Sequence, residues 1–394
     1  MTKLRIIVSG MVGVYPVGGV AWDYLQYVLG LSNLGHDVYY FEDTWRRPYN
    51  PAENQYVDDG FYSAKFIGNF FKAYAPELSS KWYYLHMKEK GFGMDKAEFE
   101  NVSRTADLFL NISGACFIPE TLSERCLKIF IDTDPGYNQI MISERPKWSE
   151  NIERWCSSVS YHDQHFTYAE NIHGEDCIIP KVRFDWKTTR MPIAVDFWNH
   201  FSDKGPYENA PWTTVLSWNE FNGKVIYEGI EYKGKGHEFG KILELPRNTK
   251  SPIKIAVGGE NAPRELLRRY GWEVIDGPKA TLSPKLYQGF IAGSRGEISV
   301  AKNVYVAMRS GWFSCRSACY LAAGRPVITQ DTGFGKFIPT GEGLFSFKTI
   351  EDILTAFDTI NSDYNKHSLA ALATANEYFR ADKILAKLTA DLGL

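Results

Sequence analysis

The sequence predicts an α/β protein of two domains, each built around a mainly parallel β-sheet. At 394 residues the chain exceeds the size at which one hydrophobic core keeps growing, so two domains with a cleft between them are expected. Short apolar runs alternate with amphipathic helical segments in both halves, which is typical of parallel sheets covered by helices. The 44% hydrophobic and 23% charged content is that of a folded globular protein, and no apolar stretch is long enough to span a bilayer.

The first domain opens on a strand, a glycine-containing loop, a helix and a second strand. These are expected at 4–9, 10–19, 21–34 and 37–41. Apolar residues recur at helical spacing from Trp22 to Leu34, and Gly35 is placed to end the helix, so the order is a βαβ unit. Further strands are expected at 108–112, 127–131 and 166–168, with helices and long loops over 49–99.

The second domain begins after a proline-rich junction near 180–192. Its expected strands are 213–217, 253–257, 273–275, 298–301 and 326–329, and its expected helices are 237–243, 263–269 and 316–323. Residues 350–394 are predicted to be helical throughout. We therefore expect a first domain at 1–190, a second at 191–365, and C-terminal helices at 366–394 that pack back on the first domain.

The composition argues against several classes of protein. The six cysteines include no CxxC pair, so neither a zinc site nor a disulfide framework is indicated, and Cys315 and Cys319 are interpreted as small buried residues. A net charge of -3 gives no overall attraction to nucleic acid or anionic membranes. The apolar run at the N-terminus contains Ser9 and Gly10 and is typical of a strand rather than a secretion signal, so a cytoplasmic location is expected.

The segment 310–335 carries the strongest functional pattern. Ser314 is placed to cap a helix that begins near Cys315, with Arg316 and Ser317 in its first turn. Helix N-termini favour anions, so backbone amides, a guanidinium and a hydroxyl are expected to converge on a diphosphate here.

A short strand is expected directly after this helix, and polar residues follow it. Asp331, Thr332 and Gly333 come at its carboxyl end, where ligands bind in parallel sheets. Glu297 and Lys302 flank the neighbouring strand, so they are further candidate contacts. A solvated surface role for Glu297 stays open.

Three sequence patterns together resemble the glycosyltransferases of the GT-B fold. In those enzymes a helix that closes in small residues is followed by Gly-[Lys/Arg]-Pro-Val, a strand and a glycine-bearing loop, and the matching run here is 324–327, GRPV. The run 232–236, YKGKG, resembles the Lys-Gly run whose lysine contacts donor phosphates in that family. The run 35–40, GHDVYY, resembles the family's opening pattern.

The resemblance implies two Rossmann-like domains facing across a cleft, and transfer of a sugar from a nucleoside diphosphate sugar to a hydroxyl-bearing acceptor. The expected donor is a UDP-sugar, a co-substrate rather than a cofactor. By the same likeness Lys235, with Lys233 behind it, contacts the donor phosphates. No metal is expected, because no DxD cluster lies in the second domain and cationic side chains can neutralise the leaving group instead.

The sequence departs from the family pattern at one position. Many retaining members carry two glutamates eight positions apart, the second of them at the place of Cys319, and this chain has no glutamate there. The resemblance therefore does not decide between a retaining and an inverting reaction.

The glycine-containing loop of the first domain does not match a dinucleotide-binding turn. Its sequence is GMVGVYPVGG rather than GxGxxG, and Pro16 would disturb such a turn, so an NAD site is not expected. By the family likeness the loop borders the cleft, with Gly13, Gly18 and Gly19 on the acceptor side.

An inverting transfer needs a base that takes the proton of the acceptor hydroxyl. Asp132 and Asp134 follow a buried strand and Asp23 starts the first helix, so these are the catalytic candidates. The alternatives are a turn-forming role for Asp132 and Asp134 and a favourable charge near a helix N-terminus for Asp23. His162 and His165 have the spacing of metal ligands, but no third ligand is evident.

The acceptor and two alternative functions stay open. The run 45–49, WRRPY, mixes cations and aromatic rings as nucleic-acid contacts do, so DNA remains a possible acceptor beside a plain surface role. The alternatives to a transferase are a nucleotide-sugar epimerase of the same architecture and a nucleotide-sugar-binding protein without catalysis.

Overall fold

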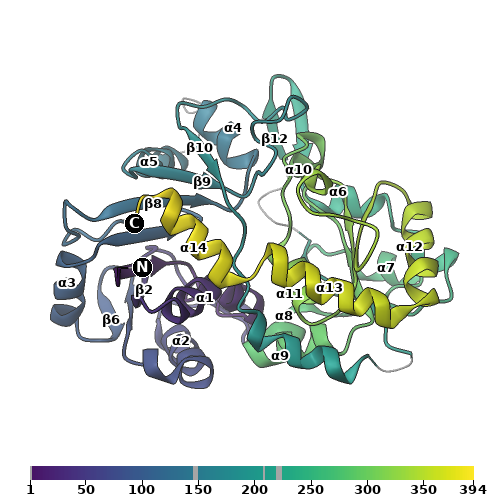
Figure 1. The fold of residues 1–394 in the computed structure, drawn as a ribbon, viewed down its shortest axis with the longest axis horizontal. Helices are drawn as coiled ribbons and strands as arrows, with labels where there is room; N and C mark the ends of the chain where they lie inside the picture. The colour runs from purple at the N-terminus through teal and green to yellow at the C-terminus, as the bar shows by residue number, and fades with distance from the viewer. Residues whose placement is uncertain (1, 145–149, 207–208, 219–223) are drawn as a thin grey trace.

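The computed structural model describes residues 2–144, 150–206, 209–218 and 224–394, and it consists of two α/β halves that lie side by side (Figure 1). The sheet of the first half is parallel throughout except for its last pair, β5 and β6. Its described strands run in the order β10 (Trp186–Thr188), β9 (Gln164–Thr167), β8 (Leu127–Asp132), β7 (Leu108–Ile112), β1 (Arg5–Ser9), β2 (Asp37–Glu42), β5 (Trp82–His86) and β6 (Lys90–Gly93).

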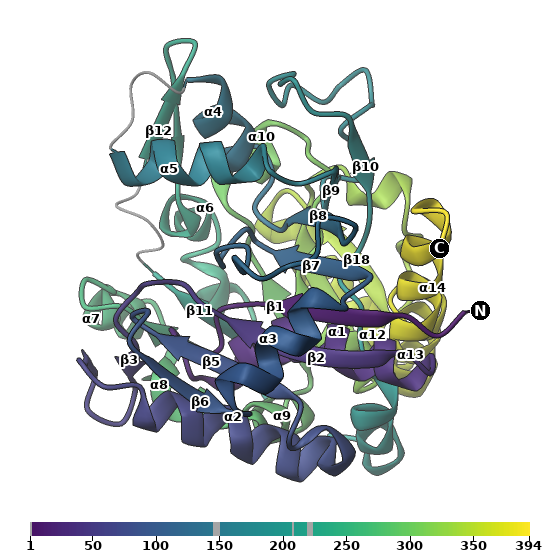
Figure 2. The same ribbon diagram turned by 90° about the vertical axis from the view of Figure 1, so that its left-hand side faces the viewer.

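Helices cover both faces of this first sheet. On β1, Ile6 and Val8 pack in one core with α1 (Gly18–Asn33) and α2 (Phe61–Tyr74), whereas Ile7 packs in another with α3 (Lys96–Arg104). Successive side chains of a strand point to opposite faces, so this division produces three layers. Two further helices, α4 (Tyr137–Ser143) and α5 (Glu150–Val159), lie near β8 to β10 (Figure 2).

The described strands of the second half form a fully parallel sheet. Their order is β15 (Glu273–Asp276), β14 (Ile253–Gly258), β11 (Trp212–Ser217), β16 (Gly296–Ser299), β17 (Val327–Gln330) and β18 (Leu344–Phe347). The accompanying helices are α6 (Lys235–Gly240), α7 (Arg264–Arg269), α8 (Gly277–Thr281), α9 (Pro284–Ala292), α10 (Asn303–Ala307), α11 (Cys315–Ala322) and α12 (Ile350–Ser362). Two small hairpins add β3 (Tyr49–Asn50) with β4 (Gln55–Tyr56), and β12 (Lys224–Tyr227) with β13 (Ile230–Lys233).

The chain crosses between the halves twice, and the two crossings are hydrogen-bonded to each other. The first leads from β10 to β11, and the second leads from α13 (Tyr364–Tyr378) to α14 (Ala381–Asp391). Ile193 N–H donates to Phe379 O (2.7 Å), and Ala381 N–H donates to Ile193 O (2.9 Å). Helix α14 then lies over the first half (Figure 1), where Gly30 of α1 leaves room for Leu385.

The two mainly parallel sheets confirm the predicted α/β class, but several elements differ from the prediction. The edge strands β10 and β18 and the hairpin β12–β13 were not predicted. Strands β5 and β6 lie within 49–99, which was expected to hold helices and loops. Four of the five residues of β5 are buried, so its sequence shows no strand-like alternation. The stretch 350–394, predicted to be helical throughout, holds the three helices α12, α13 and α14, and Asp363 separates the first two: its Oδ1 accepts from Lys366 N–H (3.1 Å) and starts α13. None of the described helices combines the length and apolar character needed to cross a membrane.

Candidate active site

A cleft of about 1190 Å³ opens between the two halves, at the carboxyl ends of strands from both sheets. We call its first side the N-wall, formed by the lining residues of segments 15–24, 49–56, 112–113, 133 and 168. The opposite side is the C-wall, formed by the lining residues of segments 215–217, 235, 258–264, 276–287 and 312–316. Ligands of parallel sheets bind at such strand ends, so this cleft is the candidate active site.

The N-terminus of α11 opens into the cleft from the C-wall. Ser314 lies at the N-cap position and lines the cleft, but its side chain accepts no capping hydrogen bond, so the predicted capping role is wrong. The first amides of a helix have no acceptor within the helix, and the helix dipole favours an anion beside them. The start of α11 therefore presents an anion-binding position on the cleft side.

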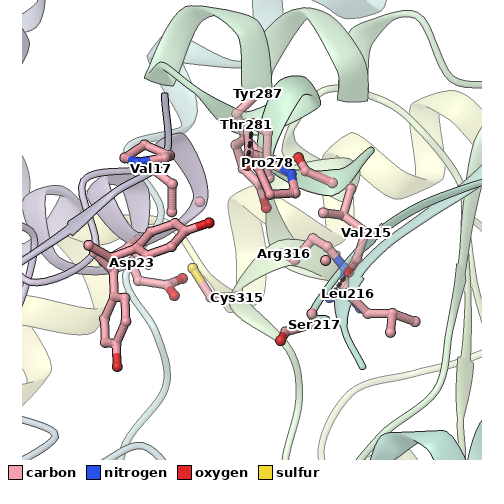
Figure 3. Close-up of a pocket in the computed structure, with 18 of the residues that line it drawn as sticks. Val17, Asp23, Val215, Leu216, Ser217, Pro278, Thr281, Tyr287, Cys315 and Arg316 are labelled. Carbon is pink, nitrogen blue, oxygen red and sulfur yellow. Dashed lines mark hydrogen bonds between the residues drawn. The ribbon is translucent and has the colours of Figure 1, made fainter. Parts of the chain in front are cut away.

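Arg316, in the first turn of α11, is held by the second sheet (Figure 3). Its Nη1 donates to Val215 O (2.6 Å), its Nη2 donates to Ser299 Oγ (2.6 Å), and its Nε donates to the Glu297 carboxylate. Burial is the largest single influence and acts to lower the pKa of Arg316, but the charge and hydrogen bond of Glu297, together with Tyr287 and Tyr320, raise this pKa above its ordinary value. Glu297 is fully buried, so it neither contacts a ligand nor lies on the surface, and it balances the charge of a fixed hydrogen-bond donor at the cleft.

Of the two lysines in the YKGKG run, only Lys235 lines the cleft. It is the first residue of α6 and is 9% exposed. Lys233 lies on β13 with its side chain exposed, and its backbone N–H donates to Asn303 Oδ1 (3.1 Å). The structure thus favours Lys235, the first choice from the sequence, as the ligand-facing lysine.

Two further cations of the C-wall were not predicted. Arg264 begins α7, directly after the loop that follows β14, and Lys279 lies in α8, directly after β15. Together with Lys235 and Arg316 they make four cations among the described lining residues of the C-wall. The carboxylates that line this wall are Glu260 and Asp276, so the lining cations outnumber them. The rule that ligands sit at carboxyl ends of parallel strands could have found these residues, because β14 and β15 were both predicted.

Asp23 faces this cationic side from the N-wall. It lies in the second turn of α1 and is exposed, and Figure 3 shows its carboxylate directed towards Cys315. Hydrogen bonding with Cys319, burial and the charge of Asp23 raise the pKa of the Cys315 thiol well above its ordinary value. The Cys315 thiol therefore remains neutral between Asp23 and Arg316.

Asp132 is an internal residue rather than a cleft carboxylate. It is fully buried, and it accepts hydrogen bonds from Asn138 Nδ2 (2.6 Å), Gln139 Nε2 (2.8 Å) and Thr167 Oγ1 (2.7 Å). Burial raises the pKa of Asp132 and these donors act against the rise. Its place corrects the catalytic prediction, because Asp132 does not line the cleft and its partners belong to α4, to β9 and to the turn after β8.

Asp134 and Lys302, predicted as a base and a donor contact, are paired with each other across the halves. Lys302 Nζ donates to Asp134 Oδ2 (2.6 Å), and the Tyr305 hydroxyl donates to the same carboxylate. Neither Asp134 nor Lys302 lines the cleft. Both predictions are therefore corrected, since the two charges compensate each other.

The loop after β17 also meets the first half instead of the cleft. Asp331 pairs with Arg309 (3.3 Å), which pairs with Asp176 of the first half (2.8 Å), and Lys336 also pairs with Asp176. We call Asp134, Lys302 and Tyr305, together with Asp176, Arg309, Asp331 and Lys336, the polar bridge.

Three more predicted donor contacts lie outside the cleft. Thr332 Oγ1 donates to Trp312 O (2.6 Å), and Gly333, at φ +93°, lies beside Arg309 and takes up the turn that follows β17. Ser317 is fully buried although it is in the first turn of α11, because its position on the helix points into the core. These placements correct the predictions for Thr332, Gly333 and Ser317.

The three glycines predicted on the acceptor side have three different surroundings. Gly19 lines the cleft. Gly18 does not, and a Cβ there would lie 2.4 Å from Ser283 O of the second half, so this glycine permits the close approach of α1 to α9. Gly13 N–H donates to Glu42 Oε2 (2.7 Å) in the interior, which corrects its assignment to the acceptor side.

The histidines and the remaining cysteine have structural places. His162 contacts Asn111 and the carbonyl of Ser158, and His165 contacts the carbonyl of Val159 (2.9 Å). Cys319 is fully buried. Within the described ranges no group of three or more His, Cys, Asp or Glu side chains is arranged to hold a metal ion.

Much of the N-wall was not predicted either. Tyr15, Tyr24, Tyr49, Tyr56 and Tyr168 line it, and they come from three of its segments. Apart from Tyr49, which ends the run WRRPY, their sequence signal is the high aromatic content of 15%, which does not say which rings gather at the cleft. Ser113 and Thr133, which line the same wall, follow β7 and β8 and could have been found from those strand ends.

No protein-family model and no curated protein matches the sequence. Solved structures match over nearly the whole chain. An alpha-glucosyltransferase in complex with UDP and a 13-mer DNA has a TM-score of 0.62 at 9% identity, covering 99% of this chain and 98% of that one. HepE from Anabaena, in complex with UDP and glucose, has a TM-score of 0.59 at 10% identity over 99% of this chain and 100% of that one.

A third match is AviGT4, a glycosyltransferase involved in avilamycin A biosynthesis. Its TM-score is 0.54 at 13% identity, and the match covers 99% of this chain and 97% of AviGT4. At such low identities the likeness shows the fold. The chain has the two-domain GT-B fold that its sequence patterns predicted.

Proposed function

We propose that the protein is a glycosyltransferase, which moves a sugar from a nucleoside diphosphate sugar to a hydroxyl-bearing acceptor bound in the interdomain cleft. The observation that carries the proposal is the opposition of the two walls. The C-wall offers the start of α11 and an excess of cations, and the N-wall offers one carboxylate, Asp23, among its described lining residues.

The donor diphosphate is proposed to bind on the C-wall. The first-turn amides of α11, the Lys235 ammonium and the fixed guanidinium of Arg316 would stabilise the negative charge that develops as the diphosphate leaves. Because these donors are held in place before the reaction, they need little reorganisation in the transition state, which makes them the largest expected catalytic contribution.

Asp23 is proposed as the general base of the transfer. As the bond between the sugar C1 and the diphosphate oxygen breaks, the acceptor oxygen forms its bond to C1 and its proton passes to the Asp23 carboxylate. Asp23 is suited to this task because it is exposed on the N-wall and faces the start of α11, which puts the base opposite the leaving group.

UDP is proposed as the leaving group, and metal-independent transfer is proposed with it. The support for UDP is the fold shared with HepE and the alpha-glucosyltransferase, both in complex with UDP. The support for metal independence is the set of C-wall cations, which can neutralise a diphosphate themselves. Turnover should therefore survive a chelator, and a collapse of activity that added Mg²⁺ restores would reject this part.

The deciding experiment is a thermal-shift screen of the full chain against UDP-, ADP- and GDP-sugars, followed by product analysis. A donor at ~100 times its dissociation constant should add about 2.7 kcal/mol to the free energy of unfolding. With that donor and a panel of hydroxyl compounds, release of the nucleoside diphosphate should require an acceptor. No binding by any nucleotide sugar would reject the proposal.

Two other outcomes correspond to the alternative functions. Conversion of the nucleotide sugar into an isomer, without an acceptor and without release of the diphosphate, would indicate an epimerase. Donor binding that no acceptor ever converts into diphosphate release would indicate a binding protein.

A further inference from the structure

The two walls of the cleft differ in charge, and the difference concerns the acceptor. Asp23 is the sole charged side chain among the described lining residues of the N-wall, and it is negative. The lining cations Lys235, Arg264, Lys279 and Arg316 all belong to the C-wall, where the proposed diphosphate needs them. A phosphorylated acceptor on the N-wall would therefore meet a carboxylate and no lining cation.

The cations that suggested nucleic acid in the sequence lie outside the cleft. Arg46 and Arg47 are exposed and do not line it, and Arg47 pairs with Asp58 (2.9 Å). Exposed ion pairs of this kind contribute little to the free energy of folding, and their charged groups stay hydrated. The part of that run which reaches the cleft is Tyr49, an uncharged ring.

Uncharged aromatic rings form a platform at the mouth of the N-wall. Tyr49 and Tyr56 are partners on the β3–β4 hairpin, with ring centroids 5.5 Å apart and ring planes at 63°, and Tyr56 is 58% exposed. Tyr49 N–H donates to Val14 O (2.8 Å), which ties the hairpin to the loop that carries Tyr15. Burial and hydrogen bonding with Tyr15 raise the pKa of Tyr56 to about 12, so the platform stays uncharged at neutral pH.

Deeper in the cleft, the N-wall presents a chain of hydroxyl groups beside Asp23. The Tyr24 hydroxyl lies 3.0 Å from Ser113 Oγ, and Ser113 Oγ lies 2.7 Å from Thr133 Oγ1. Hydroxyls can both donate and accept, so such a chain can match the hydroxyls of a ligand in either sense. Burial raises the pKa of Tyr24 and the charge of Asp23 adds to this rise, so the hydroxyl chain lies within electrostatic reach of the proposed base.

We propose that the acceptor is an uncharged carbohydrate. One sugar ring would pack its C–H face on the exposed ring of Tyr56, which Tyr49 supports edge-on, since an aromatic face combines apolar area with a negative quadrupole. Its hydroxyls would bind the chain formed by Tyr24, Ser113 and Thr133, which brings one of them to Asp23. This inference rests on the proposed function and adds the class of acceptor to it.

The test measures diphosphate release by the full chain, using the UDP-sugar that gives the largest thermal shift. The acceptors are neutral mono-, di- and trisaccharides, including maltose and cellobiose, glucose 6-phosphate, and a short single-stranded DNA. A neutral saccharide should raise diphosphate release at least ~10-fold above donor hydrolysis, whereas glucose 6-phosphate and DNA should not. Stimulation by glucose 6-phosphate or DNA alone, or by no neutral saccharide, would overturn the inference.

Tyr56→Ala should raise the KM for the stimulating saccharide ~10-fold, equivalent to about 1.4 kcal/mol, because it removes the aromatic face on which the sugar packs. Tyr56→Phe keeps the ring and should restore the KM. The matched control is Tyr161→Ala, another exposed tyrosine that does not line the cleft and should leave the KM unchanged. An unchanged KM in Tyr56→Ala would reject the platform.

The design separates this inference from the proposed function. If nucleotide sugars do not bind at all, the proposed function fails. If a donor binds and is hydrolysed but only phosphorylated acceptors stimulate its release, the proposed function stands and the neutral-acceptor inference fails.

Discussion

The cleft and the polar bridge are both built from polar residues at strand ends, yet they differ in where the charges find their partners. In the cleft, Asp23 lies on the N-wall and Lys235 and Arg316 line the C-wall, where Arg316 pairs with Glu297 of its own half. In the polar bridge, Asp134 and Lys302 have already met, at 2.6 Å. Position at the carboxyl end of a strand thus brings a residue to the interface between the halves, and the opposite half determines whether it meets a ligand or protein.

The sharpest test of this comparison replaces one aspartate on each side. Asp23→Asn should lower kcat ~10²–10⁴-fold, because it removes the proposed base while keeping the shape of the side chain. Steady-state kinetics should show this loss with an unchanged dissociation constant for the donor. The matched Asp134→Asn, which changes a carboxylate of the polar bridge, should keep most of the activity. Equal losses in the two variants would remove the distinction between the regions.

A third carboxylate, Glu42, faces neither the cleft nor the bridge, and it should govern stability rather than turnover. Burial raises its pKa to about 7, although the N–H of Gly13, the hydroxyl of Tyr40 and the N–H of Val14 act against the rise. The folded protein therefore holds this proton more tightly than the unfolded chain. Stability should fall as pH rises from about 4.5, the ordinary pKa, to about 7, by up to about 3 kcal/mol.

Glu42→Gln should flatten this decline, because the amide does not titrate. Urea unfolding at about pH 5 and pH 8 measures the difference between the variant and the original chain. Burial also raises the pKa of the neighbouring Asp43, to about 6, so part of the slope should persist in the variant. Equal slopes in both proteins would show that Glu42 does not cause the decline.

Two lysines, Lys235 of the cleft and Lys302 of the polar bridge, allow the same two regions to be compared by their effect on donor binding. Lys235→Met should raise the dissociation constant for UDP ~10- to 100-fold, since a hydrogen bond to a charged group contributes about 1.5–3 kcal/mol. Lys302→Met should leave that constant unchanged but lower the free energy of unfolding by about 1–3 kcal/mol, because Asp134 loses its partner. Calorimetry and urea unfolding measure the two effects, and weaker UDP binding in Lys302→Met would count against the assignment.

The smallest effect should come from two adjacent glycines of α1. Gly18→Ala should cost about 1–3 kcal/mol, because its Cβ would lie 2.4 Å from the backbone oxygen of Ser283 in the other half. Gly19→Ala places a Cβ 3.5 Å from the Tyr287 ring, an ordinary contact, so it should be neutral or stabilise by up to about 1 kcal/mol. Urea unfolding of both variants measures the signs, and two equal changes would contradict the close approach of α1 to α9.

The sequence could predict the layers and the strand ends, because periodicity and strand order are local properties. It led to Lys235, Ser314, Arg316 and Asp23, all of which the structure places at the cleft. It could not separate Asp23 from Asp132, since the donors that bury Asp132 come from residues up to 35 positions away.

The sequence also could not predict which residues of one half pair with residues of the other half. Nothing near Lys302 in the sequence indicates that Asp134 will neutralise it, because the two are 168 positions apart. The role of Glu297 could not be predicted either, since it depends on Arg316, which lies beside Glu297 only in the folded protein. The aromatic platform escaped prediction because Tyr15, Tyr49 and Tyr56 become neighbours only when the short hairpin folds onto the loop after β1.

The paired crossings of the chain have a mechanical consequence. Ile193 is hydrogen-bonded to Phe379 and Ala381, so the two connections between the halves lie side by side and can act as a single hinge. Rotation of one half relative to the other about this hinge would change the width of the cleft without stretching either connection. The polar bridge joins the two halves directly through ion pairs, so these pairs must separate before the two walls can move apart.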